Sequence, residues 1–148
     1  MNQKKSKSTL NKSKDYLTLS IKPEAINNIC FSVADEIYEK DLVKKEQYRQ
    51  QRFEHGFDDT ETWHMDRTMA LFIIPRLKRF LEVNNGIPND ETEESYDEKI
   101  RFIISAFENY YVSDKYFNSV DIEERKKPTD DVRQAVEYLS KLWFELWW

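Results

Sequence analysis

The sequence predicts an all-α fold, a single-domain bundle of four to five helices that follows a disordered basic N-terminal arm. One observation is the scarcity of glycine, since only two occur among 148 residues, where about ten are usual. Tight hairpins, phosphate loops and dinucleotide fingerprints need glycine, so this count disfavours those architectures. A second observation is that apolar residues recur every three or four positions in several segments, as amphipathic helices require.

Charge divides the chain into two parts. Residues 1–14 contain five lysines and no acidic residue, which predicts a disordered Lys-rich arm. The remaining residues, 15–148, contain 18 basic and 28 acidic side chains and so have a net charge of −10. An acidic body disfavours nucleic acid as a partner, except through the arm. A lone cysteine, Cys30, and a longest apolar run of six residues favour a reduced cytoplasmic protein that does not enter a membrane.

The first helix is expected from Pro23 to about Glu54. The alternation of Leu17, Leu19 and Ile21 before it indicates a short extended segment. Proline suits a first helical turn, and the predicted core-facing positions are Ile26, Ile29, Cys30, Val33, Ile37 and Tyr38. Gly56 is expected to end the helix in a left-handed conformation.

The second helix is expected to begin at an Asp59 or Thr60 cap and to end before the sequence Asn84-Asn85-Gly86. Pro75 removes one backbone hydrogen bond from its middle, which predicts a kink or a break. The predicted core-facing stripe is Met69, Ile73, Leu77, Phe80 and Leu81.

Two further helices complete the predicted bundle. Ser95 and Glu98 have capping-box spacing before a regular apolar stripe of Ile100, Ile103, Ile104, Phe107, Tyr110 and Tyr111. A loop is expected over 112–120 and a polar stretch up to Pro128. The last helix is expected to begin at Thr129 or Asp130, with heptad-like apolar positions at Val132, Val136, Leu139, Trp143 and Leu146.

The segment 49–86 carries a recognisable pattern. Its residues are Gly56, Phe57, Asp59, Glu61, Trp63 and Asp66, followed by Pro75, Arg76, Leu77, Lys78 and Phe80. This pattern resembles a family of short, largely uncharacterised proteins encoded by bacteriophages, although His64 and Met65 depart from it. The resemblance covers about a quarter of the chain and implies a phage origin and a helical fold, but no activity.

Aromatic residues at the C-terminus favour a binding function. Trp143, Phe144, Trp147 and Trp148 fall on both sides of the last helix, and a small bundle can bury only one side. Exposed aromatic surface is typical of interfaces. Together with the acidic residues Glu91, Glu93 and Glu94, these side chains predict a binding site for a protein partner or a second copy of the chain. The predicted protein is non-catalytic and needs no cofactor. The resemblance alone suggests that it acts on a host process or on antiviral defence.

The alternative is a metal-dependent hydrolase of a phosphorylated small molecule. Its candidate ligands are His55, Asp59, Glu61 and His64, since two imidazoles and carboxylates can hold a divalent transition metal. The competing interpretation is that these acids cap a helix. A second candidate magnesium site consists of two carboxylate pairs, Glu36 with Glu39 and Glu94 with Asp97, which chance also produces in so acidic a chain.

Two basic stretches offer positive charge beside aromatic rings. One is the segment Pro75 to Phe80, and the other is the side of the first helix that carries Lys45, Arg49 and Arg52. Such a surface suits RNA or an acidic protein, but the simpler interpretation is a solvated face that offsets the acidic residues.

Overall fold

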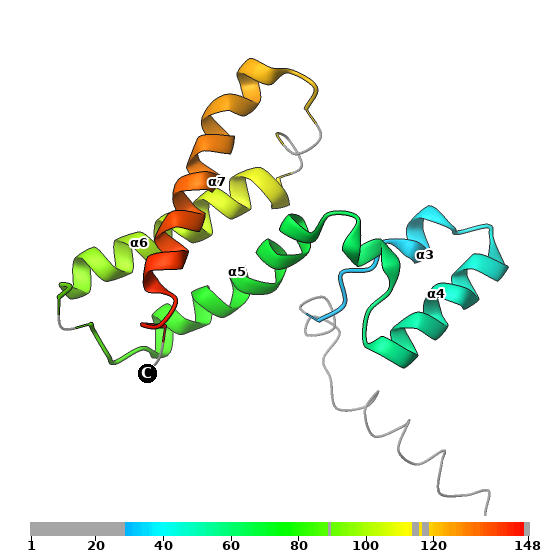
Figure 1. Ribbon diagram of the computed structural model, residues 1–148, viewed down its shortest axis with the longest axis horizontal. Coiled ribbons are helices and arrows are strands. Elements are labelled where there is room, and N and C mark those ends of the chain that lie inside the picture. The colour runs from blue at the N-terminus through cyan, green and yellow to red at the C-terminus, as the bar shows by residue number, and fades with distance from the viewer. Residues whose placement is uncertain (1–28, 89, 114–115, 117–118, 147–148) are drawn as a thin grey trace, which may run out of the picture. The chain divides into compact units, whose positions relative to one another are not determined.

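The computed structural model describes residues 29–88, 90–113, 116 and 119–146. These residues form α3 (Ala34–Ile37), α4 (Leu42–His55), the 3₁₀ turn η1 (Asp59–Thr62), α5 (Met65–Val83), α6 (Glu93–Phe107), the π-helical turn η2 (Glu108–Val112) and α7 (Ile122–Leu142) (Figure 1). The all-α prediction is confirmed. The Lys-rich arm, the expected extended segment at 16–21, Trp147 and Trp148 lie outside the described residues.

The chain is divided by its contacts into two compact units, residues 1–58 and residues 59–148. Each unit is described by itself below. The expectation of one domain over residues 15–148 stays a prediction.

In the first unit, the continuous helix predicted as far as Glu54 is wrong, because the chain turns between α3 and α4. Asp41 accepts a hydrogen bond from the backbone N–H of Lys44 at 3.0 Å and so starts α4 as its N-cap. Tyr38 stacks on Tyr48 with ring centroids 5.3 Å apart, which holds the turn against α4. Gly56 ends α4 at φ 84°, as predicted.

A buried carboxylate ties this unit together. Asp58 is 1% exposed, and its Oδ2 accepts hydrogen bonds from Ser32 Oγ and from Arg52 Nη1, each at 2.5 Å. Arg52 Nη1 also donates to Ser32 Oγ at 2.9 Å. A buried carboxylate needs such donors to offset its desolvation. From the sequence, Arg52 is predicted to lie on a solvated basic face. In the structure it joins Ser32, which precedes α3, to Asp58, which follows α4.

In the second unit, α6 packs against both α5 and α7 (Figure 1). The core consists of buried residues from these helices and η2: Ala70, Ile74, Leu77, Tyr96, Ile100, Ile103, Ile104, Ala106, Phe107, Tyr110, Tyr111, Ala135 and Leu142. The apolar stripe predicted for the third helix is confirmed at every one of its positions. This stripe is the centre of the unit because it contacts helices on two sides.

Helix α5 begins later and faces the core differently from the prediction. Residues 59–62 form the separate turn η1, so that α5 begins at Met65, and its N-cap His64 makes no side-chain capping bond. Leu77 is buried as expected, and the expected core-facing residues Ile73, Phe80 and Leu81 are partly buried against the core. The expected core residue Met69 is instead 61% exposed. The small side chain of Ala70 takes the buried position beside it. Pro75 lies inside α5 without breaking it, and α5 ends at Val83, as predicted.

The starts of α6 and α7 correct two predicted caps. Thr92, not Ser95, caps α6 and accepts from the Ser95 backbone N–H at 3.2 Å. Asp121, not Thr129 or Asp130, caps α7 and accepts from the backbone N–H groups of the next turn. The earlier caps prevail because each lies where the chain changes from extended to helical backbone. Pro128 is consequently an internal, buried residue of α7.

The expected core positions of the last helix are confirmed only in part. Val132, Leu139 and Leu146 are partly buried against the core. Val136 and Trp143 are more than half exposed, and Ala135 and Leu142 take the fully buried positions. At these two positions the buried residue precedes the predicted one by one place.

Candidate partner-binding site

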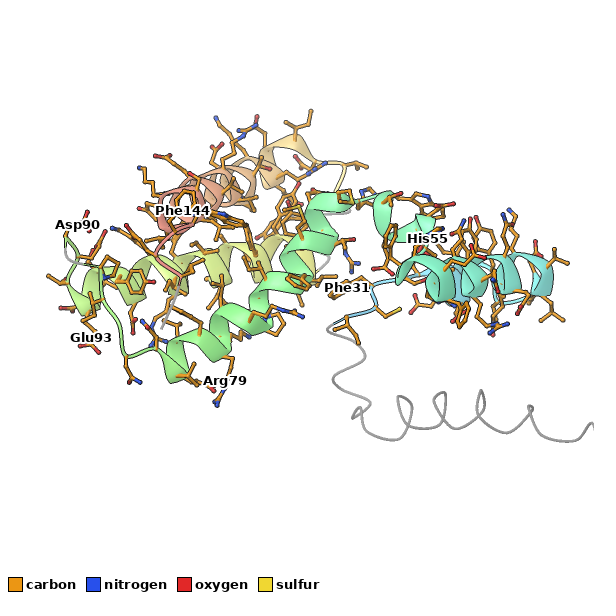
Figure 2. The ribbon with its side chains drawn as sticks, turned by 60° about the horizontal axis from the view of Figure 1, so that its bottom comes forward. Phe31, His55, Arg79, Asp90, Glu93 and Phe144 are labelled. Atoms are coloured by element: carbon orange, nitrogen blue, oxygen red, sulfur yellow. The ribbon has the colours of Figure 1, made fainter. Side chains whose placement is uncertain are left out.

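The end of α7 exposes two large aromatic side chains. Leu142 is buried in the core, and Leu146, four residues later, packs against the core as well. Glu145 donates its backbone N–H to the Leu142 carbonyl at 2.8 Å, so the chain continues in a tight turn beyond the helix. Two residues between these anchors are exposed to solvent. Trp143 is 59% exposed, and Phe144, labelled in Figure 2, is 88% exposed.

The acidic first turn of α6 lies beside this end of α7. The Tyr96 hydroxyl donates a hydrogen bond to the Glu145 carbonyl at 2.6 Å, although the two residues are 49 positions apart. Burial raises the pKa of Tyr96, with smaller contributions from the carboxylates of Glu145 and Asp97, so the hydroxyl remains a donor. The start of α6 and the end of α7, two helix ends that are distant in the sequence, are therefore joined by this bond.

The three acidic residues proposed for partner binding, Glu91, Glu93 and Glu94, differ in how far their carboxylates are exposed to a partner. Glu91 has only 17% of its side chain exposed and forms an ion pair with Lys99. Hydrogen bonds from Lys99 and Ser95 lower the pKa of the Glu91 carboxyl. Glu93 and Glu94 are exposed, and neither forms an ion pair with another residue that the structure describes.

We use the name aromatic–acidic patch for two groups of exposed residues at the helix ends that the Tyr96–Glu145 bond joins: Trp143 and Phe144 at the end of α7, and Glu93 and Glu94 at the start of α6. These residues combine apolar area with carboxylates that form no ion pair with a cation in the part of the chain that the structure describes. Aromatic anchors with a polar rim are typical of protein–protein interfaces. Both helix ends are anchored in the core, α6 by Tyr96 in its first turn and α7 by Leu142 at its end.

A second exposed surface, not recognised from the sequence, lies along α5. Met65, Met69, Phe72, Arg76 and Arg79 follow one another in steps of four, three, four and three residues, and each of them is exposed. We call this surface the α5 stripe. The Arg76 guanidinium lies 3.5 Å from the Phe72 ring centroid and donates to the Phe72 carbonyl. The heptad spacing is the signal that could have identified the stripe, but it assigned Met69 to the core.

The proposed metal ligands lie in different settings. His55 is exposed at the end of α4, 3.9 Å from a Glu54 oxygen, and belongs to the first unit. Asp59 and His64 are exposed in the second unit, whereas Glu61 is buried. Among the described residues, no three His, Cys, Asp or Glu side chains are grouped so that they could hold a metal ion.

The two carboxylate pairs are not brought together within either unit. Glu36 and Glu39 lie at and just after α3, in the first unit, and both are exposed. Glu94 and Asp97 lie on α6, in the second unit, where Asp97 pairs with Arg101 at 3.7 Å. Each pair therefore has the placement of ordinary acidic residues on a helix surface.

Asp66, an acid two residues after the candidate ligand His64, contributes to packing. It accepts a hydrogen bond from the Tyr111 hydroxyl at 3.1 Å. Tyr111 is 5% exposed in the π-helical turn, and burial, followed by the Asp66 charge, raises the pKa of its hydroxyl. Next to it, Arg125 donates to the Tyr110 hydroxyl at 2.6 Å. These bonds attach α5 and α7 to η2, the turn that follows α6.

A shallow groove of about 490 Å³ runs between α5 and α6. Its charged lining residues are held in ion pairs: Lys78 with Glu108, Arg101 with Asp97, and Glu82 with Arg79. A catalytic groove is expected to aim polar groups at a common point, and this arrangement instead directs them at one another.

Searches against protein-family models, curated proteins and solved structures find no match to this chain. The resemblance of residues 49–86 to phage-encoded proteins therefore stays a prediction. No helix in the described ranges combines the length and the apolar character that crossing a membrane requires.

Proposed function

We propose that the protein is a small non-catalytic binding protein that attaches to another protein molecule through the aromatic–acidic patch. The observation that carries this proposal is the exposure of Trp143 and Phe144, at 59% and 88%, beside the well-buried Leu142. Tryptophan and tyrosine dominate binding energy at interfaces, and large aromatics exposed to water cost solubility without a partner. The phage resemblance favours a host protein as the partner, including a component of antiviral defence.

Charge defines the class of partner further. Glu93 and Glu94 add two exposed carboxylates to the apolar residues, and residues 15–148 have a net charge of −10. A complementary surface would present an apolar pocket with arginine or lysine around it. Such a partner would associate faster at low ionic strength, because the long-range attraction is screened by salt.

The test is site-specific photo-crosslinking in bacterial cells. Phe144 is replaced by p-benzoylphenylalanine, which keeps the aromatic ring at the patch. The control carries the same group at Val120, which is 97% exposed and precedes α7, roughly 30 Å from its other end. We expect a discrete adduct from position 144 and none of the same size from position 120.

A second test adds Trp143→Ala to the protein that carries the crosslinker at position 144. This substitution should weaken the adduct several-fold, since truncating an aromatic anchor typically costs more than 1 kcal/mol of binding free energy. If position 144 gives no discrete adduct with any protein, including a second copy, the proposed function is wrong. Equal adducts from positions 144 and 120 would also contradict it.

A further inference from the structure

We propose that a groove at the turn between α3 and α4 is occupied by residues 16–22 of the same chain. The groove has a volume of about 560 Å³ and is lined by Ile37, Tyr38, Lys40, Asp41, Leu42 and Val43; we call it the α3–α4 groove. Both the groove and its proposed occupant belong to the unit of residues 1–58. This inference concerns a surface other than the aromatic–acidic patch and does not rest on the proposed function.

The α3–α4 groove exposes large apolar side chains that no other part of the described chain covers. Ile37 is 53% exposed, Leu42 is 77% exposed and Val43 is 79% exposed. Ala34 is the buried apolar residue in the described part of this unit. Neighbouring exposed apolar side chains mark a site where another segment or molecule binds, so we expect the groove to have an occupant.

Residues 16–22 have a sequence pattern that suits an apolar groove. Leu17, Leu19 and Ile21 occupy alternate positions, with a small hydroxyl residue after each of the two leucines. In the extended segment that the sequence predicts here, these three apolar side chains share one side of the chain. They can therefore enter the groove together while the hydroxyl groups stay in water.

The segment is also near enough along the chain to reach the groove. From Ile29, the first described residue, to Ile37 the chain takes five residue steps before α3 and three within it, which span at most roughly 23 Å. The eight residue steps from Ile21 to Ile29 can span roughly 26–29 Å. So short a tether gives the segment a roughly millimolar effective concentration at the groove, which favours it over a separate molecule.

Charge favours the same occupant. Residues 1–28 contain six lysines and two acidic residues, a net charge of +4, whereas residues 29–58 contain five basic and seven acidic residues, a net charge of −2. Glu36 and Glu39 stand on either side of the first two lining residues in the sequence, and both are exposed. Neither forms an ion pair with a residue that the structure describes. These carboxylates attract a lysine-bearing segment, whose Lys22 directly follows the apolar residues.

The test is disulfide trapping in the full chain, with Cys30→Ser to remove the chain's own thiol. Leu19→Cys is combined with Val43→Cys, a substitution at an exposed position. We expect oxidation of the dilute protein to give an intramolecular disulfide. The matched control combines Ser20→Cys with Val43→Cys, which moves one thiol to the other side of the segment and should react roughly tenfold more slowly.

The contribution of charge is tested in the same protein. Adding Glu36→Gln/Glu39→Gln should slow the trapping from position 19 several-fold at low ionic strength, and salt should slow it in the protein that keeps both carboxylates. The matched control is Glu123→Gln/Glu124→Gln, which makes the same change in net charge in the first turn of α7 and should leave the rate unchanged. Circular dichroism checks that every variant keeps its helices.

Equal trapping rates from positions 19 and 20 would overturn this inference, because a segment that does not occupy the groove meets position 43 equally from either side. The absence of any disulfide from position 19 would overturn it as well. A disulfide-linked dimer in place of the intramolecular bond would reject the chain's own segment and assign the groove to a second copy.

Discussion

At the scale of single residues, the buried polar groups of Asp58 and Tyr111 are held by specific partners from other segments. Asp58 receives two hydrogen bonds, from Ser32 and Arg52, and Tyr111 donates to Asp66. Leaving such a group unpartnered costs about 1–3 kcal/mol, and more if it is charged. Asp58 and Asp66 lie close in the sequence to the candidate metal ligands Asp59 and His64, and the structure gives both a role in holding helices together.

Tyr111 gives a pH-dependent prediction at this scale. Its pKa is raised in the folded protein by burial and by Asp66, whereas in the unfolded chain it ionises near pH 10. Its contribution to stability is therefore complete below about pH 10. Above that pH the unfolded chain loses the proton first, and the contribution falls by up to about 1.4 kcal/mol per pH unit.

The variant Tyr111→Phe lacks this titration. Urea unfolding of both proteins between pH 8 and 11 should show the stability difference between wild type and variant shrinking only above about pH 10. A difference that stays constant up to pH 11, or grows, would contradict the assignment of the raised pKa to Tyr111.

At the scale of elements, helix ends are fixed by short-range bonds, and the chain offers competing caps. In α6, Thr92 and Ser95 are both suitable residues, and Ser95 is the one with capping-box spacing. The structure uses Thr92, because the Thr92 hydroxyl accepts from the Ser95 backbone and the Ser95 hydroxyl is engaged with Glu91. The choice lengthens α6 by its acidic turn, which is the turn that carries Glu93 and Glu94.

Substitution separates the two caps. Thr92→Ala should lower the free energy of unfolding by about 1 kcal/mol, because it leaves an N–H of the first turn without its acceptor. Ser95→Ala should change it by less than about 0.5 kcal/mol, since it removes no cap and alanine is a better helix former. Thermal unfolding of both variants measures the difference. A larger loss from Ser95→Ala would instead identify Ser95 as the cap.

At the scale of the whole molecule, stability is concentrated in one unit. All residues of the hydrophobic core cluster lie between Ala70 and Leu142, within residues 59–148. Among described residues of the first unit, Ala34 is the buried apolar side chain, and Asp58 is the buried polar one. Helices of this size depend on tertiary packing for most of their stability, so the two units should differ in their ability to fold alone.

A fragment of residues 59–148 should fold without the rest of the chain. We expect a helical circular dichroism spectrum and a cooperative thermal transition close to that of the full protein, because the fragment keeps the complete core. A peptide of residues 29–58 should show no cooperative transition. If the larger fragment is unfolded in isolation, its core depends on residues 1–58.

The sequence by itself determined the all-α class, the apolar face of α6 and the helix ends at Gly56 and Val83. These features depend on signals within a few residues: glycine scarcity, spacing by three and four, a left-handed glycine and an Asn-Asn-Gly stop. Sequence reasoning also predicted surplus aromatic surface among Trp143, Phe144, Trp147 and Trp148, because one small core cannot bury both sides of a helix, but it placed Trp143 among the core-facing positions as well.

Tertiary structure decided which way α5 and α7 face, and which distant residues meet. Met69 and Ala70 both fit an apolar spacing, and only packing against α6 selects Ala70 for the core. The break between α3 and α4 depends on Tyr38 stacking on a residue ten positions later. The aromatic–acidic patch depends on a bond across 49 positions, from Tyr96 to Glu145. Local periodicity contains no information on contacts across such separations, because they are selected by how whole helices pack.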